Sequence, residues 1–246
     1  MKPPPRPLLA VGRRVRLRHV LQTLATLPKP RSVLDAGCGD ARLAARVASR
    51  IPDASVLGID IDTNAISFAR SYTGAIPNLE LRTVGIGNPS VDKLFDMVVC
   101  TDVLEHIRKD RSAVDWLAER VALRGYLVIH VPASPQKHVF SSIDAAIAME
   151  VGSGQGPHVR EGYSADDLST LIRNAGLKMV STATTFHHPI VRLAEDADTL
   201  LYQHRARLIK AMLLPLLIVA SELERAPSST RRGYGLLVVA RRDNEP

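Results

Sequence analysis

Cysteine and aromatic residues are scarce in this sequence. Its 246 residues include 2 cysteines, and Phe, Trp and Tyr together make up 4%. Cys38 and Cys100 have neither the spacing of a disulfide framework nor that of a metal site, so we expect a reducing, cytoplasmic compartment and no metal ligands. The aromatic residues form no platform with basic side chains, which argues against stacking on single-stranded nucleic acid.

Long apolar runs are also absent. The run at residues 8–11 has four apolar residues, against the roughly seven that a signal peptide requires. Residues 211–220 are uncharged, but they number ten and include Pro215, whereas a transmembrane helix needs about 20 residues. Because basic residues precede this run, the segment 205–221 has two interpretations. It is a buried lid or homodimer face, or an interfacial helix that contacts a membrane or a lipid-linked substrate.

Charge and overall composition leave most function classes open. The formal net charge is +7, with 46% hydrophobic and 23% charged residues, which is ordinary for a soluble globular protein. A positive net charge permits an anionic partner such as nucleic acid, a phospholipid surface or a phosphorylated substrate, without choosing among them. The basic stretch at residues 13–18 is a weak indication of nucleic acid.

Apolar, β-branched segments alternate with helical segments along the chain. This alternation predicts βαβ units and therefore an α/β fold of three layers, in which a seven-stranded, mostly parallel sheet has helices on both faces. Ligands of such sheets bind beyond the carboxyl ends of the strands, at the topological switch point. Helices are expected at 11–27, 40–51, 63–72, 112–121 and 164–175, and strands at 32–37, 54–60, 78–84, 95–102, 125–131, 178–186 and 234–242.

A single domain accommodates the whole chain. We expect an N-terminal basic helix within 1–29, a ligand-binding core at 30–186, a helical insertion or lid at 187–229, and the final strand within 230–246. Within the core, residues 133–163 interrupt the alternation. Both insertions lie at loop ends over the site, so we expect them to select the substrate.

Two helices carry start signals in the sequence. Asp62 or Thr63 is expected to cap the helix that follows the second strand. Ser164, followed three residues later by Asp167, forms a capping pattern, and Gly176 lies just past the end of that helix.

The turn after the first strand reads VLDAGCGDARLA at residues 33–44. A dinucleotide-binding turn would place a third small residue where Arg42 stands. The carboxylates of Asp35 and Asp40 would also repel a pyrophosphate, whereas they suit a ligand that carries positive charge. The turn therefore favours a cationic ligand over a dinucleotide.

These residues resemble the first motif of the class I S-adenosylmethionine-dependent methyltransferases. The resemblance extends over about residues 30–186 and the final strand. Asp60, which stands 21 positions after Gly39 (60 − 39), matches the acidic residue that binds the ribose hydroxyls in that family. The segment FDMVVCTDVLEHI at 95–107 resembles the fourth-strand motif of its small-molecule branch, including ubiquinone-biosynthesis-like enzymes. The family's acidic residue after the third strand is missing here, and its third glycine is replaced by Ala41 or Arg42, depending on the variant of the motif.

The resemblance implies a Rossmann-like methyltransferase fold with S-adenosylmethionine as cofactor. Adenine would be held by backbone groups at 84–86 or by Asn88. Base-methylating relatives carry an N/D-P-P-Y/F/W sequence where this chain has TDVLEH, so nucleic acid is not favoured as the acceptor. The expected cofactor-binding residues are Asp35, Ala36, Gly37, Cys38, Gly39, Asp60, Ile61, Val84, Gly85, Thr101 and Asp102.

Fewer sequence signals indicate which residues contact the acceptor. His106 is either a general base for an acceptor hydroxyl or a motif histidine that hydrogen-bonds its loop. His158 is a second catalytic candidate, and Arg160 and Tyr163 are candidates for substrate binding, because the insertion should fold over the site. The resemblance favours O-methylation of a small-molecule or glycolipid-like acceptor. N- or C-methylation of a small metabolite, and a cofactor-binding sensor or partner subunit without turnover, are the alternatives.

Overall fold

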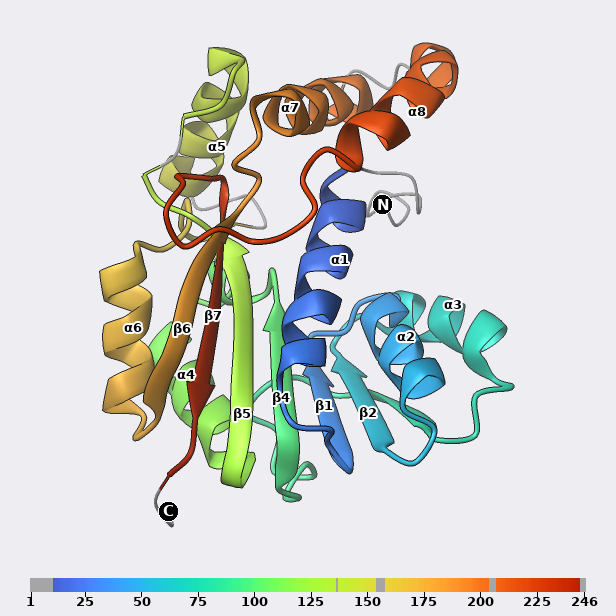
Figure 1. Cartoon of the computed structure of the whole chain (residues 1–246), viewed down its shortest axis with the longest axis vertical. Helices are drawn as coiled ribbons and strands as arrows, with labels where there is room; N and C mark the ends of the chain where they lie inside the picture. Colours follow the sequence, from blue (N-terminus) through green and yellow to red (C-terminus); the bar gives the residue numbers. More distant parts are fainter. Residues whose placement is uncertain (1–10, 136, 154–157, 204–206, 244–246) are drawn as a thin grey trace.

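The computed structural model describes residues 11–135, 137–153, 158–203 and 207–243. They form three layers, with a twisted sheet between two layers of helices (Figure 1). Seven strands lie side by side in the order β3-β2-β1-β4-β5-β7-β6. Their bounds are Ser32–Ala36 for β1, Ser55–Asp60 for β2, Leu79–Thr83 for β3, Phe95–Thr101 for β4, Val121–Pro132 for β5, Lys178–Thr185 for β6 and Gly235–Arg241 for β7.

The sheet is mixed but mostly parallel. Strands β1 to β5 pair in parallel, whereas β7 runs antiparallel to both β5 and β6. This confirms the expected fold class. Strand β5 begins four residues earlier than predicted, at Val121, with an irregular register against β4 at Phe95 and Met97.

Alternate residues of the central strands face opposite helix layers, as the period of two in a strand requires. In β4, Met97 and Val99 pack against α1, α2 and α3, whereas Val98 and Cys100 pack against α4 and α6. Because both faces are covered, the strands read as continuous apolar runs. The helices are α1 (Val11–Thr26), α2 (Arg42–Arg50), α3 (Thr63–Thr73), α4 (Asp110–Glu119) and α6 (Ala165–Asn174).

Both predicted helix caps are present. The side chain of Asp62 accepts hydrogen bonds from the backbone N–H groups of Asn64 and Ala65, so Asp62 rather than Thr63 is the cap of α3. The Ser164 hydroxyl accepts from the Asp167 N–H at 3.1 Å at the start of α6. Gly176 follows that helix with φ +82°, a left-handed conformation that favours glycine.

Three further helices lie beyond the carboxyl ends of the parallel strands, at the top of Figure 1. They are α5 (Ser141–Ser153), α7 (Pro189–Gln203) and α8 (Arg207–Ser221), and they fall within the insertions 133–163 and 187–229. The start of α1 joins this group, because Val11 and Val15 are buried against residues of α7 and α8. None of the described helices combines the length and the apolar character needed to cross a bilayer. Arg205, the first residue of the segment 205–221, lies outside the described residues.

Candidate active site

The switch point of the sheet lies between β1 and β4. From β1 the chain moves outward through β2 to β3, and it then returns to place β4 on the other side of β1. The turn after β1 and the residues after β4 therefore meet at one edge of the sheet, where ligands of this fold class bind. We call it the switch-point edge.

The glycine turn after β1 packs directly against the residue that follows Asp102. Gly37 has φ +79°, and a Cβ atom added to it would lie 2.3 Å from Cγ2 of Val103. Glycine is thus required here by both backbone conformation and space. Gly39 also has a positive φ of +54°, but no atom lies within 4 Å of the position that a Cβ would take there, so its partly buried backbone has room for a ligand to approach.

Ala41 takes the place of the third glycine. It is fully buried and has φ +56°, a left-handed conformation in which alanine is disfavoured relative to glycine. Arg42 begins α2 and lies outside this conformation. The structure therefore assigns the motif's third position to Ala41.

Asp60 ends β2 beside the turn. Its Oδ2 accepts a hydrogen bond from the Gly39 N–H at 2.7 Å, and its Oδ1 accepts one from the Asp62 N–H at 2.8 Å. A carboxylate has about four acceptor positions, so each oxygen can still accept from a ribose hydroxyl. This donor and acceptor chemistry fits the cofactor that the resemblance implies.

Asp35 lies at the base of the turn and is almost fully buried. Its Oδ2 accepts the Ala44 N–H of α2 at 3.1 Å. Burial raises the pKa of Asp35 to about 7, with added repulsion from Asp60 and Asp40. The ligand that suits this group of carboxylates is cationic, because a positive charge would favour their ionised forms. Burial likewise raises the pKa of the neighbouring Cys38 thiol.

The third-strand side of the edge is lined by small and apolar groups. Ile61 is 75% exposed, and its Cγ2 lies 2.8 Å from the position of a Cβ on Gly85. Val84 packs partly buried next to Gly85. The Oδ1 of Asn88 accepts the Ser90 N–H at 2.9 Å, so it already has a donor. The exposed apolar side chain of Ile61 beside residues 84–85 offers a surface on which a flat adenine ring can pack, and this assignment remains a prediction.

Asp102 follows β4 in a strained conformation, with φ +53°. Its Oδ2 lies 2.6 Å from Nε of Arg16 in α1, and its Oδ1 lies 2.7 Å from Nδ1 of His130 in β5. His130 in turn contacts Oγ1 of Thr185 at 2.9 Å. Burial opposes ionisation, but Arg16 and His130 outweigh it and lower the pKa of Asp102 to about 2. Asp102 is therefore a fixed negative charge at the switch-point edge.

Three arginines of the basic stretch in α1 form ion pairs with carboxylates of the same chain. Arg13 pairs with Asp40 of the glycine turn at 2.7 Å. Arg14 and Arg18 both pair with Glu222, at 3.0 and 2.6 Å. Because these arginines have intramolecular partners, the basic stretch gives no separate support for nucleic-acid binding.

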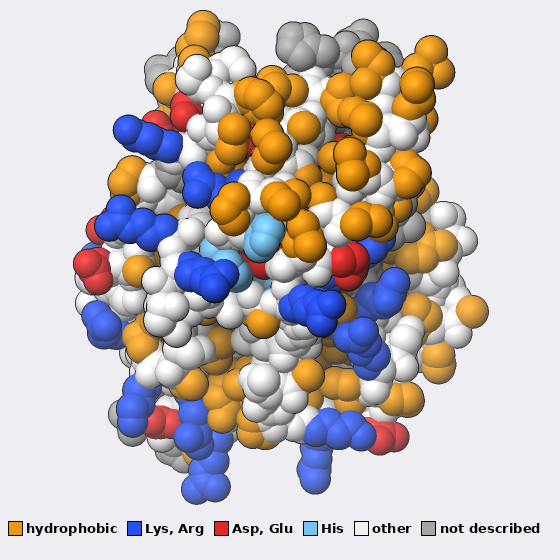
Figure 2. Space-filling view, turned by 45° about the horizontal axis from the view of Figure 1, so that its top comes forward, with side chains coloured by type: hydrophobic (Ala, Val, Ile, Leu, Met, Phe, Trp, Pro, Cys, Tyr) orange, Lys and Arg blue, Asp and Glu red, His pale blue; other side chains and the backbone are white. Residues whose placement is uncertain are grey.

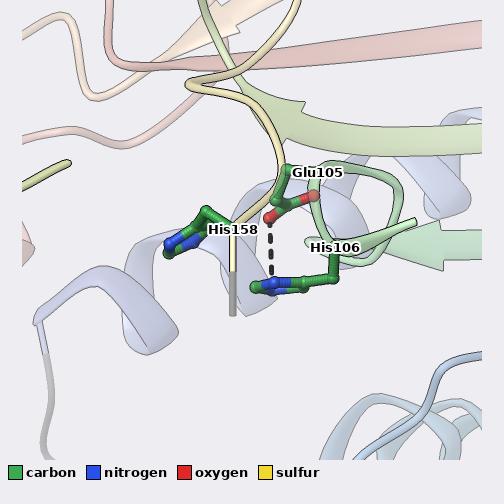
Figure 3. A group of neighbouring side chains, drawn as sticks. All are labelled: Glu105, His106 and His158. Carbon is green, nitrogen blue, oxygen red and sulfur yellow. Dashed lines mark ion pairs between the residues drawn. The ribbon is translucent and has the colours of Figure 1, made fainter. Parts of the chain in front are cut away.

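The catalytic candidates His106 and His158 are brought together, although 52 residues separate them in the sequence (158 − 106). Their rings stack with centroids 4.7 Å apart. Glu105 and His106 belong to the short 3-10 helix η1 (Leu104–His106), which begins just after Asp102 and Val103. Figure 3 shows Glu105 pointing toward His106, with Oε1 and Nε2 3.9 Å apart, and the His158 ring beside them.

Glu105 is nearly fully buried. Burial, together with the negative charge of Asp102, raises its pKa to about 8. Its Oε2 has no hydrogen-bond partner within the described part of the chain. A buried polar atom without a partner is uncommon and marks this residue for a functional explanation.

Arg160 and Tyr163 form a cluster with Asp110 at the start of α4. The Tyr163 hydroxyl donates to Oδ2 of Asp110 at 3.0 Å, and the Arg160 guanidinium contacts both of these groups. Arg160 also donates to the carbonyl oxygen of Ile107 at 3.0 Å. These contacts tie residues 158–163 to η1, and the expected substrate contacts of Arg160 and Tyr163 remain predictions.

Three residues of the site were not predicted from the sequence. From the sequence, Arg16 belongs only to the basic stretch at residues 13–18, and Glu105 only to the motif at residues 95–107. His130 carries a signal that could have found it, because a polar residue interrupts the apolar run LVIHV in a strand covered on both faces.

Of the expected cofactor-binding residues, Thr101 ends β4 with a buried Oγ1 that has no partner among the described residues, and Ala36 ends β1 fully buried.

Comparisons with known proteins agree on this fold. A family model described as a methyltransferase domain matches residues 10–182. The ubiquinone biosynthesis O-methyltransferase of Azoarcus sp. (strain BH72) is 27% identical over 186 residues, which cover 72% of this chain and 78% of that protein. An equivalent O-methyltransferase of Nitrosomonas europaea is 25% identical over 191 residues, with 75% and 80% covered.

Solved structures give the same fold at lower identity. The N-methyltransferase NodS of Bradyrhizobium japonicum WM9, in complex with S-adenosyl-L-homocysteine, superposes with a TM-score of 0.60 at 17% identity and covers 94% of this chain and 88% of its own. Coclaurine N-methyltransferase, bound to N-methylheliamine and S-adenosylhomocysteine, gives a TM-score of 0.64 at 14% identity, with 94% and 73% covered.

Proposed function

Because the chain belongs to the class I S-adenosylmethionine-dependent methyltransferases, we propose that it methylates an oxygen of a small-molecule or glycolipid-like acceptor. When bound, S-adenosylmethionine supplies a methyl group that is already activated on a sulfonium. The observation that carries the choice of acceptor atom is the stacked pair His106–His158 beside Asp102. The imidazole nitrogens of this pair can take up the proton of an acceptor hydroxyl.

The protein's own contribution is placement and charge. The carboxylates of Asp35, Asp60 and Asp102 surround the expected position of a cationic cofactor, and in-line placement of the acceptor supplies most of the rate effect. In the transfer, the acceptor oxygen forms a bond to the methyl carbon while the carbon–sulfur bond breaks, and that electron pair stays on sulfur. The hydroxyl proton leaves to an imidazole or to water.

The preference for oxygen rests on two supports. The curated relatives that match most of this chain are O-methyltransferases of ubiquinone biosynthesis. A hydroxyl, unlike a neutral amine, must lose its proton during transfer, and His106 and His158 are groups that titrate near neutrality in water.

An exposed apolar surface on α8 supports a lipid-like acceptor. Leu208, Met212 and Leu216 follow one another at intervals of four residues and are 83%, 81% and 65% exposed. Figure 2 shows hydrophobic side chains gathered over this end of the molecule. Exposed apolar patches of this kind mark contacts with proteins or lipids. We therefore propose that α8 contacts the bilayer, or the apolar tail, that carries the acceptor.

The acceptor class can be tested with labelled cofactor. We would incubate the full chain with methyl-labelled S-adenosylmethionine and three probes: a catechol, the same catechol with a long alkyl chain, and a primary amine. Mass spectrometry should find the label on oxygen, with the alkyl catechol preferred. His106→Asn should lower kcat at least ~10-fold without weakening cofactor binding, whereas His188→Asn, at a histidine outside the site, should not. Label on the amine alone would contradict the choice of oxygen.

The α8 surface has its own test. In liposome flotation, the native chain should float with vesicles, and the double substitution Met212→Glu with Leu216→Glu should abolish this. Leu123→Glu serves as the matched control, because Leu123 is an exposed apolar residue at the start of β5. Failure of the native chain to float with neutral and with anionic vesicles would refute bilayer contact.

A further inference from the structure

His130, near the end of β5, contacts Asp102 through both its backbone and its side chain. Its carbonyl oxygen accepts the Asp102 N–H at 2.8 Å, and Nδ1 of its ring lies 2.7 Å from Oδ1 of Asp102. The pKa of Asp102 is about 2, so the carboxylate is ionised and can only accept hydrogen bonds. Nδ1 of His130 therefore carries a proton and donates it to this carboxylate.

Asp102 needs such support because its backbone is strained. Its φ of +53° lies in the left-handed region, which is disfavoured for a residue that has a Cβ atom. Strained residues of this kind persist only where their surroundings over-determine the conformation, and they cluster at functional sites. His130 supplies two of the contacts that hold Asp102. Nε of Arg16, 2.6 Å from Oδ2, fixes the other carboxylate oxygen.

The imidazole ring of His130 is itself held in one orientation. Its Nε2 lies 2.9 Å from Oγ1 of Thr185, the last residue of β6, and both residues are almost fully buried. Gly235 of β7 leaves the space for this contact. A Cβ atom on Gly235 would lie 2.1 Å from Oγ1 of Thr185 and 2.7 Å from Nε2 of His130. Residues of three neighbouring strands thus set the direction of one ring.

The Asp102 carboxylate still has room for a ligand. Its side chain is 23% exposed, and of the roughly four acceptor positions of a carboxylate, Arg16 and His130 occupy one on each oxygen. S-adenosylmethionine carries two cationic groups, a sulfonium and an ammonium. A carboxylate whose direction is fixed before the cofactor arrives loses little conformational freedom on binding, and this raises the affinity.

We propose that His130 is a positioning residue for the cofactor: it holds the Asp102 carboxylate at the switch-point edge in the direction that receives the cationic end of S-adenosylmethionine. His130 is not expected to touch the cofactor, because its ring is 2% exposed and both ring nitrogens have partners within the chain. It acts through Asp102. The inference rests on the proposed function for the cofactor alone, since the acceptor does not enter the argument.

A purely structural role is the competing explanation, in which His130 only fills space between β4, β6 and β7. Two substitutions separate these explanations because they replace different ring nitrogens. The amide of asparagine can take the place of Nδ1, so His130→Asn keeps a donor toward Asp102. The longer glutamine reaches the place of Nε2, so His130→Gln keeps a contact with Thr185 and loses the one with Asp102. His130→Leu removes both contacts.

Titration calorimetry of the full chain with S-adenosylmethionine and with S-adenosylhomocysteine tests the proposal. His130→Gln and His130→Leu should each weaken the binding of both molecules ~10-fold or more, as loss of a charged hydrogen bond would. His130→Asn should bind within ~3-fold of the native chain, because it restores the donor. His188→Asn is the matched control and should bind as the native chain does, since Nδ1 of His188 contacts only the local Ile190 N–H.

A spectroscopic measurement on the native chain adds a readout that a space-filling role would not move. The chain has 8 histidines, and ¹⁵N labelling of histidine makes their ring nitrogens visible by NMR. The signal that disappears in His130→Asn should show a protonated Nδ1, and it should shift when S-adenosylhomocysteine is added. This measurement decides the question if His130→Gln or His130→Leu does not fold, which circular dichroism shows.

Four results would overturn the inference: native affinity in folded His130→Gln, an equal loss of affinity in His130→Asn and His130→Gln, a His130 signal that ignores S-adenosylhomocysteine, or a folded native chain that binds neither molecule. The expected pattern of affinities without methyl transfer to any acceptor probe would support the role of His130 and count against the proposed function alone. Methyl transfer to oxygen together with native affinity in His130→Gln would do the reverse.

Discussion

Replacing Gly37 by alanine tests the close approach of the β1 turn to the end of β4. The new Cβ would lie 2.3 Å from Cγ2 and 3.0 Å from Cγ1 of Val103, in a backbone conformation with φ +79°. The left-handed conformation costs about 1–2 kcal/mol for a residue with a Cβ, and overpacking costs typically about 1–3 kcal/mol. We therefore expect Gly37→Ala to lower the free energy of unfolding by about 2–5 kcal/mol, a large part of the roughly 5–15 kcal/mol typical of a domain.

Gly39→Ala is the matched control. Gly39 has φ +54°, but its Cβ position has no atom within 4 Å, so only the conformational term of about 1–2 kcal/mol applies. Adding Val103→Ala to Gly37→Ala should recover the packing part of the loss. Urea unfolding followed by circular dichroism measures all four proteins, the native chain included. Equal losses for the two glycine variants, or no recovery in the double variant, would refute the reasoning.

Three buried or capping side chains give further tests. Burial raises the pKa of Asp35 to about 7, so the stability that depends on its protonated form is lost as pH rises from about 4 through 7. Asp35→Asn does not titrate, so in thermal melts its stability relative to the native chain should rise by ~3 kcal/mol between pH 5 and pH 8. Burial lowers the pKa of His19 to about 4, so the stability present above about pH 6.5 is lost as pH falls through 4. In urea titrations, the native chain should lose ~2–3 kcal/mol more than His19→Gln does between pH 7 and pH 4.5. An equal loss in both proteins would contradict this assignment. Ser164→Ala should cost about 0.5–2 kcal/mol of stability while Ser164→Asp, which keeps a cap, should not.

Local patterns were sufficient to predict most of the fold. Continuous apolar, β-branched runs bounded by turn residues located the seven strands. The caps at Asp62 and Ser164 follow from side chains that bond backbone groups two or three residues away. Such interactions are contained within a short stretch of sequence, so a single sequence carries them. The turn at Gly37 and Gly39 belongs to the same class.

Contacts between distant segments could not be predicted in this way. The Arg16–Asp102 pair joins α1 to the end of β4, and the stacking of His106 on His158 depends on how residues 158–163 fold back onto η1. Each of these contacts is set by the packing of separate elements, which the sequence of neither segment determines. The site's charges were therefore visible in the sequence, but their partners were not.

The central claim is that the switch-point edge binds S-adenosylmethionine. Titration calorimetry of the native chain with S-adenosylmethionine and with S-adenosylhomocysteine tests it most directly. We predict that both bind with one molecule per chain, and that Asp60→Asn, in a variant shown to be folded, weakens binding ~10-fold or more, as loss of a charged hydrogen-bond acceptor would. If a folded native chain binds neither molecule, the account of the site is wrong.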